Sequence, residues 1–299
     1  MKNDEPTVGR RVLLRSAVFL GVAAAAGMLS GENGAPGAGG PGPAAGPGGL
    51  PAAGAPGMLP QGPPEKSYRL RPMTAEAPAR PPVAAPAVRT RPILELPPHS
   101  PAASNGMVLT FDDGPDPRYT PGILDTLARY GVRAMFFVCG EMAAENRDLL
   151  RRIAAEGHVI GNHTWTHPLI PRLSRPALAS EIGRTSEVVQ QVVGEAPSWF
   201  RAPYGAWNRA TFEIGAELGM EPLAWTVDTL DWKEPGTTTI VSRVLDAAAP
   251  GVIVLSHDAG GDRSQSVRAI SAYLPQLLAR GYRMTLPSLP GTAPASAPS

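Results

Sequence analysis

Between residues 107 and 285 the chain alternates short apolar runs with segments whose apolar residues recur at helical spacing. The runs at 135–138 (Met-Phe-Phe-Val) and 252–255 (Val-Ile-Val-Leu) lack the alternation of polar and apolar residues that half-exposed strands show. Such runs are typical of strands buried on both faces, as in a parallel sheet covered by helices. The pattern therefore predicts an α/β fold built from repeated strand–helix units.

The expected elements follow from these runs and from helix stop signals. Strands are expected at 107–111, 134–140, 158–162, 198–202, 220–227, 251–257 and 282–286. Helices are expected at 120–131, 143–156, 174–193, 208–218, 239–249 and 265–280. The last helix is the best defined, because Val267, Ile270 and Leu274 share one stripe and Gly281 follows as a stop.

A long stretch of Gly, Ala and Pro limits the part of the chain that can fold. Residues 31–101 hold 18 of the 35 prolines, and this composition buries too little apolar surface to offset the entropy of ordering. We therefore expect a disordered linker over 31–104, one folded domain over 105–289 and a disordered tail over 290–299. Residues 1–104 are then expected to be dispensable for folding and catalysis.

Residues 1–30 show the charge-then-apolar order of an export signal. Four basic residues precede an uncharged run at 16–29: Lys2, Arg10, Arg11 and Arg15. This run is shorter than the ~20 residues that a membrane span needs. Arg10 and Arg11 resemble a twin-arginine signal, although Gly9 stands where Ser or Thr is usual. We expect an exported protein, extracellular or associated with the cell wall, and leave open whether the segment is cleaved or stays as a membrane anchor.

Charge and cysteine content exclude several classes of protein. Residues 1–104 carry 10 basic and 6 acidic side chains and the rest carry 17 and 20, so no basic surface indicates a nucleic-acid partner. The single cysteine, Cys139, excludes an intrachain disulfide framework and a Cys-rich zinc site. We expect a monomer.

Polar side chains follow five of the apolar runs, at the point where each expected strand ends. They are Asp112 and Asp113, His163 and His167, Arg201, Asp228 and Asp231, and His257. The carboxyl ends of parallel strands share one face of an α/β barrel and form its active site. These groups are therefore expected to converge although they are far apart in sequence.

Together these groups fit one chemical arrangement. Two neutral imidazoles, His163 and His167, and one carboxylate form a three-ligand site for a divalent cation with a position left open for water. The two histidines could lie on a helical turn or in a tight loop. Adjacent strand-end residues point in opposite directions, so one of Asp112 and Asp113 could bind the cation while the other accepts a proton from water. His257 is the remaining group that titrates near neutral pH and could protonate a leaving group.

Five sequence motifs carry a resemblance to a known family. In order they are Thr110-Phe111-Asp112-Asp113-Gly114-Pro115, His163-Thr164-Trp165-Thr166-His167, Arg201-Ala202-Pro203-Tyr204, Asp228-Thr229-Leu230-Asp231-Trp232 and Leu255-Ser256-His257. Over about residues 105–289 they resemble the motifs of the NodB-homology polysaccharide deacetylases, carbohydrate esterase family four. The departures are Ala202, where many relatives carry Pro, and Val159, where an acidic residue is common.

The resemblance implies a distorted (β/α) barrel and assigns a role to each group at the site. It implies one divalent cation, Zn²⁺ before Co²⁺, Mn²⁺ or Ni²⁺, held by Asp113, His163 and His167. Asp112 would be the general base, oriented by Arg201, and His257 the general acid, tuned by Asp231. The remaining implied roles concern the substrate: the Tyr204 backbone N–H binds the oxyanion, and Trp232 and Leu255 line a pocket for the acetyl methyl.

The implied activity is metal-dependent removal of N-acetyl groups from N-acetylglucosamine units of a cell-wall polysaccharide, peptidoglycan first. Chitin or chitooligosaccharide is the second substrate class, and O-acetyl xylan the third. An exported glycan-binding module that has lost catalysis is a different class, but the chain keeps the ligands, the base and the acid. A small-ring amide hydrolase of the same superfamily is a further alternative, which the export signal disfavours.

Overall fold

The computed structural model describes residues 88–97 and 104–289. The expected export signal, most of the expected linker and the expected tail after residue 289 lie outside the described residues. None of the helices in the described part is both long and apolar enough to span a membrane.

Eight strands form one sheet, and every strand pairs parallel to its neighbours in the order β5-β4-β3-β2-β1-β7-β6, with β8 beside β1. The strands are β1 Gly106–Asp112, β2 Met135–Val138, β3 Val159–Asn162, β4 Trp199–Phe200, β5 Glu221–Pro222, β6 Val227–Asp228, β7 Ile253–His257 and β8 Arg283–Met284. The predicted α/β fold, a distorted barrel of parallel strands and helices, is confirmed. The main path of the sheet ends at β5 and β6, which do not pair with each other, so strand pairing alone leaves the barrel open.

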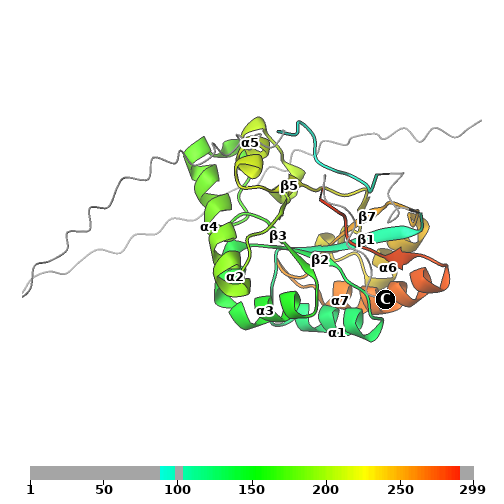
Figure 1. The fold of residues 1–299 in the computed structure, drawn as a ribbon. Helices are drawn as coiled ribbons and strands as arrows, with labels where there is room; N and C mark the ends of the chain where they lie inside the picture. The colour runs from blue at the N-terminus through cyan, green and yellow to red at the C-terminus, as the bar shows by residue number, and fades with distance from the viewer. Residues whose placement is uncertain (1–87, 98–103, 290–299) are drawn as a thin grey trace, which may run out of the picture. The chain divides into compact units, whose positions relative to one another are not determined.

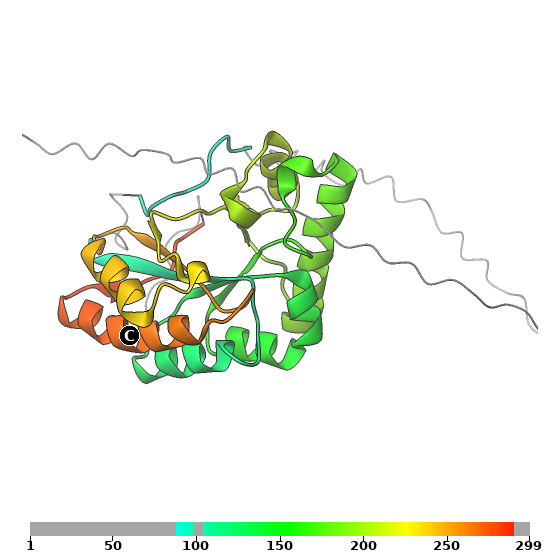
Figure 2. The same cartoon turned by 180° about the vertical axis from the view of Figure 1, so that it is seen from behind.

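Helices cover the outer face of this sheet (Figure 1). They are α1 Thr120–Arg129, α2 Gly140–Glu145, α3 Arg147–Ala155, α4 Arg175–Val193, α5 Arg209–Glu217, α6 Thr237–Asp246 and α7 Ser264–Ala279. Helices α1, α3 and α7 lie side by side along one flank of the sheet, as the view from behind also shows (Figure 2). Short 3₁₀ turns follow three of the strands: η2 Ile170–Arg172, η3 Pro203–Gly205 and η4 Asp231–Lys233.

The central strand β1 is buried on both faces, as its apolar run predicts. Leu109 and Phe111 pack in the cluster that lies between sheet and helices. Val108, which points to the opposite face, packs with Phe137 and Ile253 in a second cluster inside the barrel. Since side chains alternate along the strand, Asp112 is on the same face as Val108 and reaches the interior at the carboxyl end.

Two expected elements divide in the structure. The expected helix at 143–156 is two helices, α2 and α3, that meet at Asn146, whose side-chain amide donates to Met142 O and Pro115 O. The expected strand at 220–227 is two edge strands on opposite sides of the opening, β5 against β4 and β6 against β7. The chain between them leaves the sheet because the carbonyls of Leu223 and Ala224 accept hydrogen bonds from the Arg201 side chain.

Residues 88–97, here called the strap, belong to the folded domain and not to a linker. Ile93 N donates to Pro222 O (2.8 Å), and Ile93 O accepts from Ala224 N (2.7 Å), so the strap pairs with the open edge beside β5. Leu96 N then donates to Gly251 O (2.9 Å), just before β7. The strap therefore connects the β5 edge with the segment just before β7, and the expected linker over 31–104 is wrong for these ten residues.

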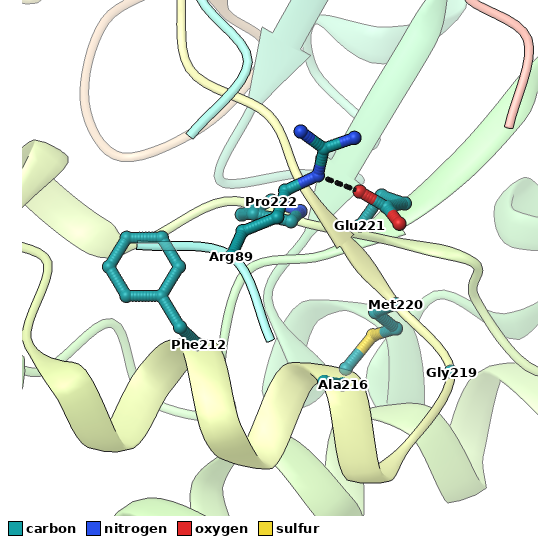
Figure 3. A pocket seen from close by; sticks show the side chains of 7 residues that line it. All are labelled: Arg89, Phe212, Ala216, Gly219, Met220, Glu221 and Pro222. Carbon is teal, nitrogen blue, oxygen red and sulfur yellow. Dashed lines mark hydrogen bonds and ion pairs between the residues drawn. The ribbon is translucent and has the colours of Figure 1, made fainter. Parts of the chain in front are cut away.

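Side chains also hold the strap in place. Leu96 is 3% exposed and packs in the interior cluster with Val108 and Leu223. Arg89 lies in a hollow beside α5 and β5, where its Nε donates to the Glu221 carboxylate (Figure 3). Composition hides this segment, because its buried leucine lies among the prolines from which a linker was expected.

The strap yields a stability prediction. Leu96→Ala in the full chain should lower the free energy of unfolding by about 2–5 kcal/mol, the usual cost of truncating a buried leucine. Leu94→Ala is the matched control, because Leu94 is 51% exposed and its truncation should change stability by no more than about 0.5 kcal/mol. Denaturant unfolding monitored by circular dichroism measures both. Equal stabilities for the two variants would show that the strap is a linker after all.

Candidate functional site

A buried ion pair lies at the carboxyl end of β1. Arg201 is fully buried, and its Nη1 donates to Asp112 Oδ1 and to Thr110 Oγ1, both at 2.7 Å. Its Nε and Nη2 donate to the carbonyls of Leu223 and Ala224 at 3.2 and 2.9 Å. Arg201 therefore holds one oxygen of Asp112 in a fixed position and leaves the other oxygen available.

Burial and Arg201 have opposite effects on Asp112. Burial raises the pKa of Asp112, and the charge and hydrogen bond of Arg201 lower it by less, so the net direction is upward. A carboxylate with a raised pKa is a stronger base than an exposed one. The geometry thus gives Asp112 the properties of a proton acceptor.

Asp113, His163 and His167 form the one cluster of potential metal ligands among the described residues. One ligand atom from each residue lies within 4.8 Å of the others. Asp113 Oδ1 is 3.5 Å from His163 Nε2 and 3.4 Å from His167 Nε2, and among the described residues this buried oxygen has no hydrogen-bond partner. A buried carboxylate oxygen without a donor, facing two imidazole nitrogens, fits a divalent cation with mixed N/O ligands.

The contacts of His163 fix its tautomer. Its Nδ1 lies 2.8 Å from the main-chain carbonyl of Arg201, which can only accept, so Nδ1 carries the proton. Nε2 is then left with a lone pair directed at Asp113, as metal-binding imidazoles require. Burial lowers the pKa of His163 to about 3, so the ring is neutral at physiological pH.

The two adjacent aspartates do not point in opposite directions as expected. His163 Nε2 lies 3.6 Å from Asp112 Oδ2 and 3.5 Å from Asp113 Oδ1, so both carboxylates face the same imidazole. The reason is that Asp113 has a φ of 78°, in the left-handed region, which ends the extended backbone and turns its side chain back toward the site. The strand rule fails because Asp113 lies one residue beyond the strand.

The two histidines lie in a tight loop, which was one of the two geometries left open. His163 directly follows β3, and Thr164 and His167 both have left-handed backbones, with φ of 70° and 57°. The Thr164 N–H donates to Asn162 Oδ1. The loop turns sharply enough to bring both rings to the same side, with ring centroids 5.0 Å apart.

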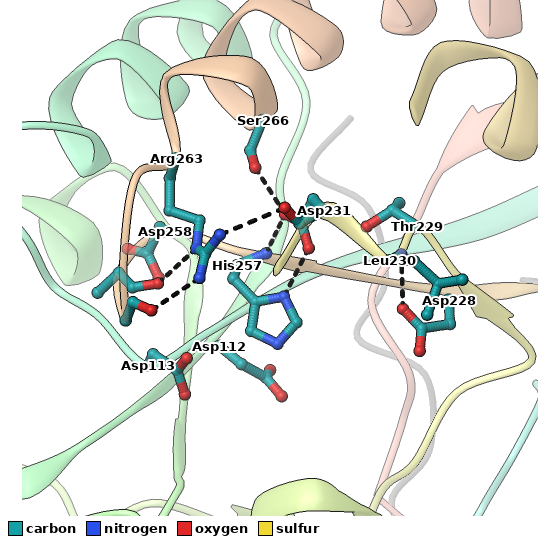
Figure 4. A network of polar contacts seen from close by, with 12 residues as sticks. Asp112, Asp113, Asp228, Thr229, Leu230, Asp231, His257, Asp258, Arg263 and Ser266 are labelled. Carbon is teal, nitrogen blue, oxygen red and sulfur yellow. Dashed lines mark hydrogen bonds and ion pairs between the residues drawn. The ribbon is translucent and has the colours of Figure 1, made fainter. Parts of the chain in front are cut away.

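A second pair of groups lies at the end of β7 (Figure 4). His257 Nδ1 is 2.7 Å from Asp231 Oδ1, and the other oxygen of Asp231 accepts from His257 N and Ser266 Oγ. Burial alone would lower the pKa of His257, but the hydrogen bond and charge of Asp231, with smaller effects of Asp113 and Asp112, raise it to about 9. His257 is therefore protonated at neutral pH. Because His257 pairs in register with Asp112 on the adjacent β1, the donor and the acceptor lie side by side.

Several residues that support the site were not predicted. The most prominent is Asp258, which is 1% exposed and accepts from Gly114 N (3.2 Å) and Thr120 Oγ1 (2.6 Å), while its own N–H donates to Asp112 O. It ties the turn after β1 to the end of β7, and a Cβ on Gly114 would lie 2.2 Å from its carboxylate. The one sequence feature that could have identified Asp258 is its position directly after His257.

Arg263 and Ser266 were also missed. Both lie near the start of α7, and they bind the carbonyl and the carboxylate of Asp231 respectively (Figure 4). Nothing in the sequence distinguishes them from other polar residues at a helix start.

The three predicted substrate-binding residues have different surroundings. Tyr204, in η3, is 67% exposed and its ring meets that of His167 edge-on at 4.5 Å. Trp232, in η4, is 50% exposed, with the Lys233 ammonium 4.8 Å from its ring centroid. Leu255 is buried in β7 at 3% exposure. Their contacts with a substrate stay a prediction.

Known proteins share both the sequence and the fold. The sequence profile of the polysaccharide deacetylase family matches residues 99–223. A peptidoglycan-N-acetylglucosamine deacetylase of Bacillus cereus is 40% identical over 185 residues, which are 61% of this chain and 67% of the relative. A chitooligosaccharide deacetylase of Bradyrhizobium is 40% identical over 201 residues, covering 63% of this chain and 92% of the relative.

Solved structures agree with these relatives. The crystal structure of the peptidoglycan N-acetylglucosamine deacetylase Bc1960 matches with a TM-score of 0.61 and 37% identity, covering 64% of this chain and 89% of that one. A family 4 carbohydrate esterase from Streptomyces lividans, in complex with acetate, matches with a TM-score of 0.58 and 32% identity, covering 62% and 94%. The chain belongs to the polysaccharide deacetylase family, carbohydrate esterase family four.

Proposed function

We propose that the protein removes acetyl groups from N-acetylglucosamine units of a cell-wall polysaccharide, with peptidoglycan as the first substrate. One observation carries the proposal. A possible ligand set for a divalent cation, a carboxylate held by a buried arginine and an imidazole held by a buried aspartate meet at one end of the sheet. These are the groups that hydrolysis of an unactivated amide needs: a site for an electrophile, a proton acceptor and a proton donor.

Asp113, His163 and His167 would hold the cation, and Zn²⁺ fits their two nitrogens and one oxygen best. When bound, the cation polarises the acetyl carbonyl and makes the attacking water more acidic. Asp112 then accepts a proton from that water while Arg201 keeps the carboxylate in place. The Tyr204 N–H would stabilise the negative charge that develops on the carbonyl oxygen.

His257 completes the reaction on the other side of the scissile bond. The carbon–nitrogen bond breaks, and the sugar nitrogen takes the proton that His257 carries, so the products are acetate and a free amine. Asp231 holds the imidazole by Nδ1, which leaves Nε2 as the donating atom. Trp232 and Leu255 would bound the space that the acetyl methyl occupies.

Chitooligosaccharide is the second candidate substrate, because relatives of similar identity are named for it. O-acetyl xylan is the third, since the same groups can hydrolyse an ester. Proteins of this fold can also lack catalysis: one matching structure, 28% identical, is a family 4 pseudoenzyme from Bacillus anthracis. Against such a role here stand the complete ligand cluster and both acid–base groups.

We further propose that the protein acts outside the cytoplasm as a monomer. The support is the sequence of residues 1–30, which has the order of an export signal, and the Pro-rich stretch after it, which would let a tethered enzyme reach into the wall.

The substrate proposal predicts a pattern of acetate release. The purified chain with Zn²⁺ or Co²⁺ should release acetate from peptidoglycan with a higher kcat/KM than from chitooligosaccharide, and from acetylated xylan least. Removal of the cation by a chelator should abolish release, and adding it back should restore it. Highest activity on xylan, or full activity of protein shown to be metal-free by elemental analysis, would contradict the proposal.

We expect mutation to distinguish the roles of the two adjacent aspartates. Asp112→Asn should still bind one cation per chain but lose turnover by about 10²-fold or more, because only the proton acceptor is removed. Asp113→Ala should lose the cation as well as the activity. Metal content by elemental analysis, measured beside acetate release, distinguishes the two. The reverse pattern of metal loss would exchange the assigned roles.

The plot of rate against pH should be bell-shaped, and the pKa of His257 should set its alkaline limb. His257 must be protonated to donate, so activity falls as pH rises through a pKa that Asp231 has raised. Asp231→Asn removes the carboxylate, burial then lowers this pKa, and the alkaline limb should move to lower pH by about 1–3 units. The acid limb should stay in place, because it reports Asp112.

Profiles of kcat/KM against pH test this expectation. Asp148→Asn is the control, because Asp148 has a fully exposed side chain in α3 and its profile should match the wild type. His257→Ala should slow hydrolysis of the N-acetyl sugar far more than that of an activated aryl acetate, whose leaving group needs no proton. A superimposed Asp231→Asn profile would mean that the proton donor lies elsewhere.

A further inference from the structure

Glu181, in the second turn of α4, lies against the loop that carries both histidine ligands. This loop, residues 163–167, is here called the ligand loop. Glu181 Oε2 accepts from the main-chain N–H groups of Trp165 (2.9 Å) and Thr166 (2.8 Å), and its Oε1 accepts from Thr166 Oγ1 at 3.0 Å. One carboxylate therefore binds three donors of the ligand loop. None of the predicted site residues supplies these bonds.

The ligand loop needs such acceptors because its backbone is strained. Thr164 and His167 both occupy the left-handed region, which is unfavourable for residues with a Cβ. Such conformations persist only where surrounding contacts hold them. The Thr164 N–H donates to Asn162 at the end of β3, whereas the next two N–H groups along the chain donate to Glu181.

The start of α2 also holds the ligand loop. Gly140 N and Glu141 N donate to the carbonyls of Thr164 and Trp165 at 2.9 and 3.2 Å. A Cβ on Gly140 would lie 2.2 Å from the Trp165 ring, so the two elements are in close contact. The guanidinium of Arg184, one turn along α4 from Glu181, lies 3.9 Å from the Trp165 ring centroid. Both α2 and α4 thus hold the loop, and Glu181 is its hydrogen-bonding contact with α4.

We infer that Glu181 is a positioning residue that sets the affinity of the protein for its divalent cation. Its hydrogen bonds go to Trp165 and Thr166 and not to the three proposed ligands, and it acts by keeping His167 at the distance from His163 at which both rings can bind one cation. The inference rests on the proposed metal site. Mutation of a residue that orients the metal ligands without binding the metal typically weakens metal binding by about 10–100-fold.

The test compares variants of the full chain stripped of metal and titrated with Zn²⁺ against a competing chromophoric chelator. Glu181→Ala should weaken Zn²⁺ binding by about 10–100-fold. Glu181→Gln should lose only a few-fold, because its carbonyl oxygen can replace Oε2 and its amide can donate to Thr166 Oγ1. Glu187→Ala, on an exposed position of the same helix, should bind as the wild type does.

Two further measurements separate positioning from general stability. At saturating Zn²⁺, Glu181→Ala should recover most of the wild-type kcat, because the base and the acid are untouched. The absorption spectrum of the Co²⁺-loaded variant should differ from that of the wild type, because the arrangement of the ligands changes. If Glu181→Ala does not fold, Glu181→Asp replaces it: the charge is kept, the reach is shorter by one methylene, and weaker Zn²⁺ binding is again expected.

The outcomes are distinct. Wild-type affinity in folded Glu181→Ala, or in Glu181→Asp where that variant replaces it, would overturn the role of Glu181 while leaving the metal site intact. An equal loss in Glu181→Gln and Glu181→Ala would overturn the hydrogen-bonding argument. A wild-type chain that binds no divalent cation would instead overturn the proposed function on which the inference rests.

Discussion

The hydrogen bonds of the buried Arg201 guanidinium are the interactions on which the rest of the site depends. A charge taken out of water is very costly unless it is paired and hydrogen-bonded, so the surrounding structure must supply a partner for every donor. Here the partners are Asp112, Thr110 and the carbonyls of residues 223 and 224. The aromatic ring of Phe137 lies 4.1 Å from the guanidinium carbon. The Arg201 main-chain carbonyl in turn fixes the tautomer of His163. One residue therefore orients Asp112, the proposed proton acceptor, with its side chain and His163, a proposed metal ligand, with its backbone.

His257, the proposed proton donor, is held by residues other than those that hold Asp112. Asp231 and Ser266 belong to η4 and α7, and neither contacts Arg201 in the hydrogen bonds described. The connection is made by strand register, which places His257 opposite Asp112, and by Asp258, which ties the turn after β1 to β7. Environment then gives each group its protonation state: burial makes His163 neutral, whereas Asp231 makes His257 a cation. One site thus holds a neutral imidazole at the proposed metal site and a charged one at the proposed proton donor.

The sequence was sufficient to predict the alternation of strands and helices and the residues that converge at the strand ends. This succeeded because burial on both faces, helix periodicity and the position after a strand are local properties of the chain. What could not be predicted depends on contacts between distant segments. The direction of Asp113 depends on a left-handed backbone, the division of 220–227 depends on the donors of Arg201, and the contacts of Glu181 and Asp258 cross between elements. The amino-acid composition cannot indicate a left-handed backbone, the division of a strand or a contact between distant elements.

The strap is the clearest case, because composition indicated the opposite of its structure. A parallel sheet whose edges are β5 and β6 leaves main-chain groups unpaired on both sides of the opening, and buried groups of this kind require partners. Ile93 O accepts from Ala224 N, and the carbonyl of the same Ala224 accepts from Arg201 Nη2. A single residue, Ala224, therefore lies between the strap and the guanidinium that holds Asp112. Pairing of the strap and orientation of Asp112 depend on the same segment, so the folded unit includes residues before the first recognisable motif.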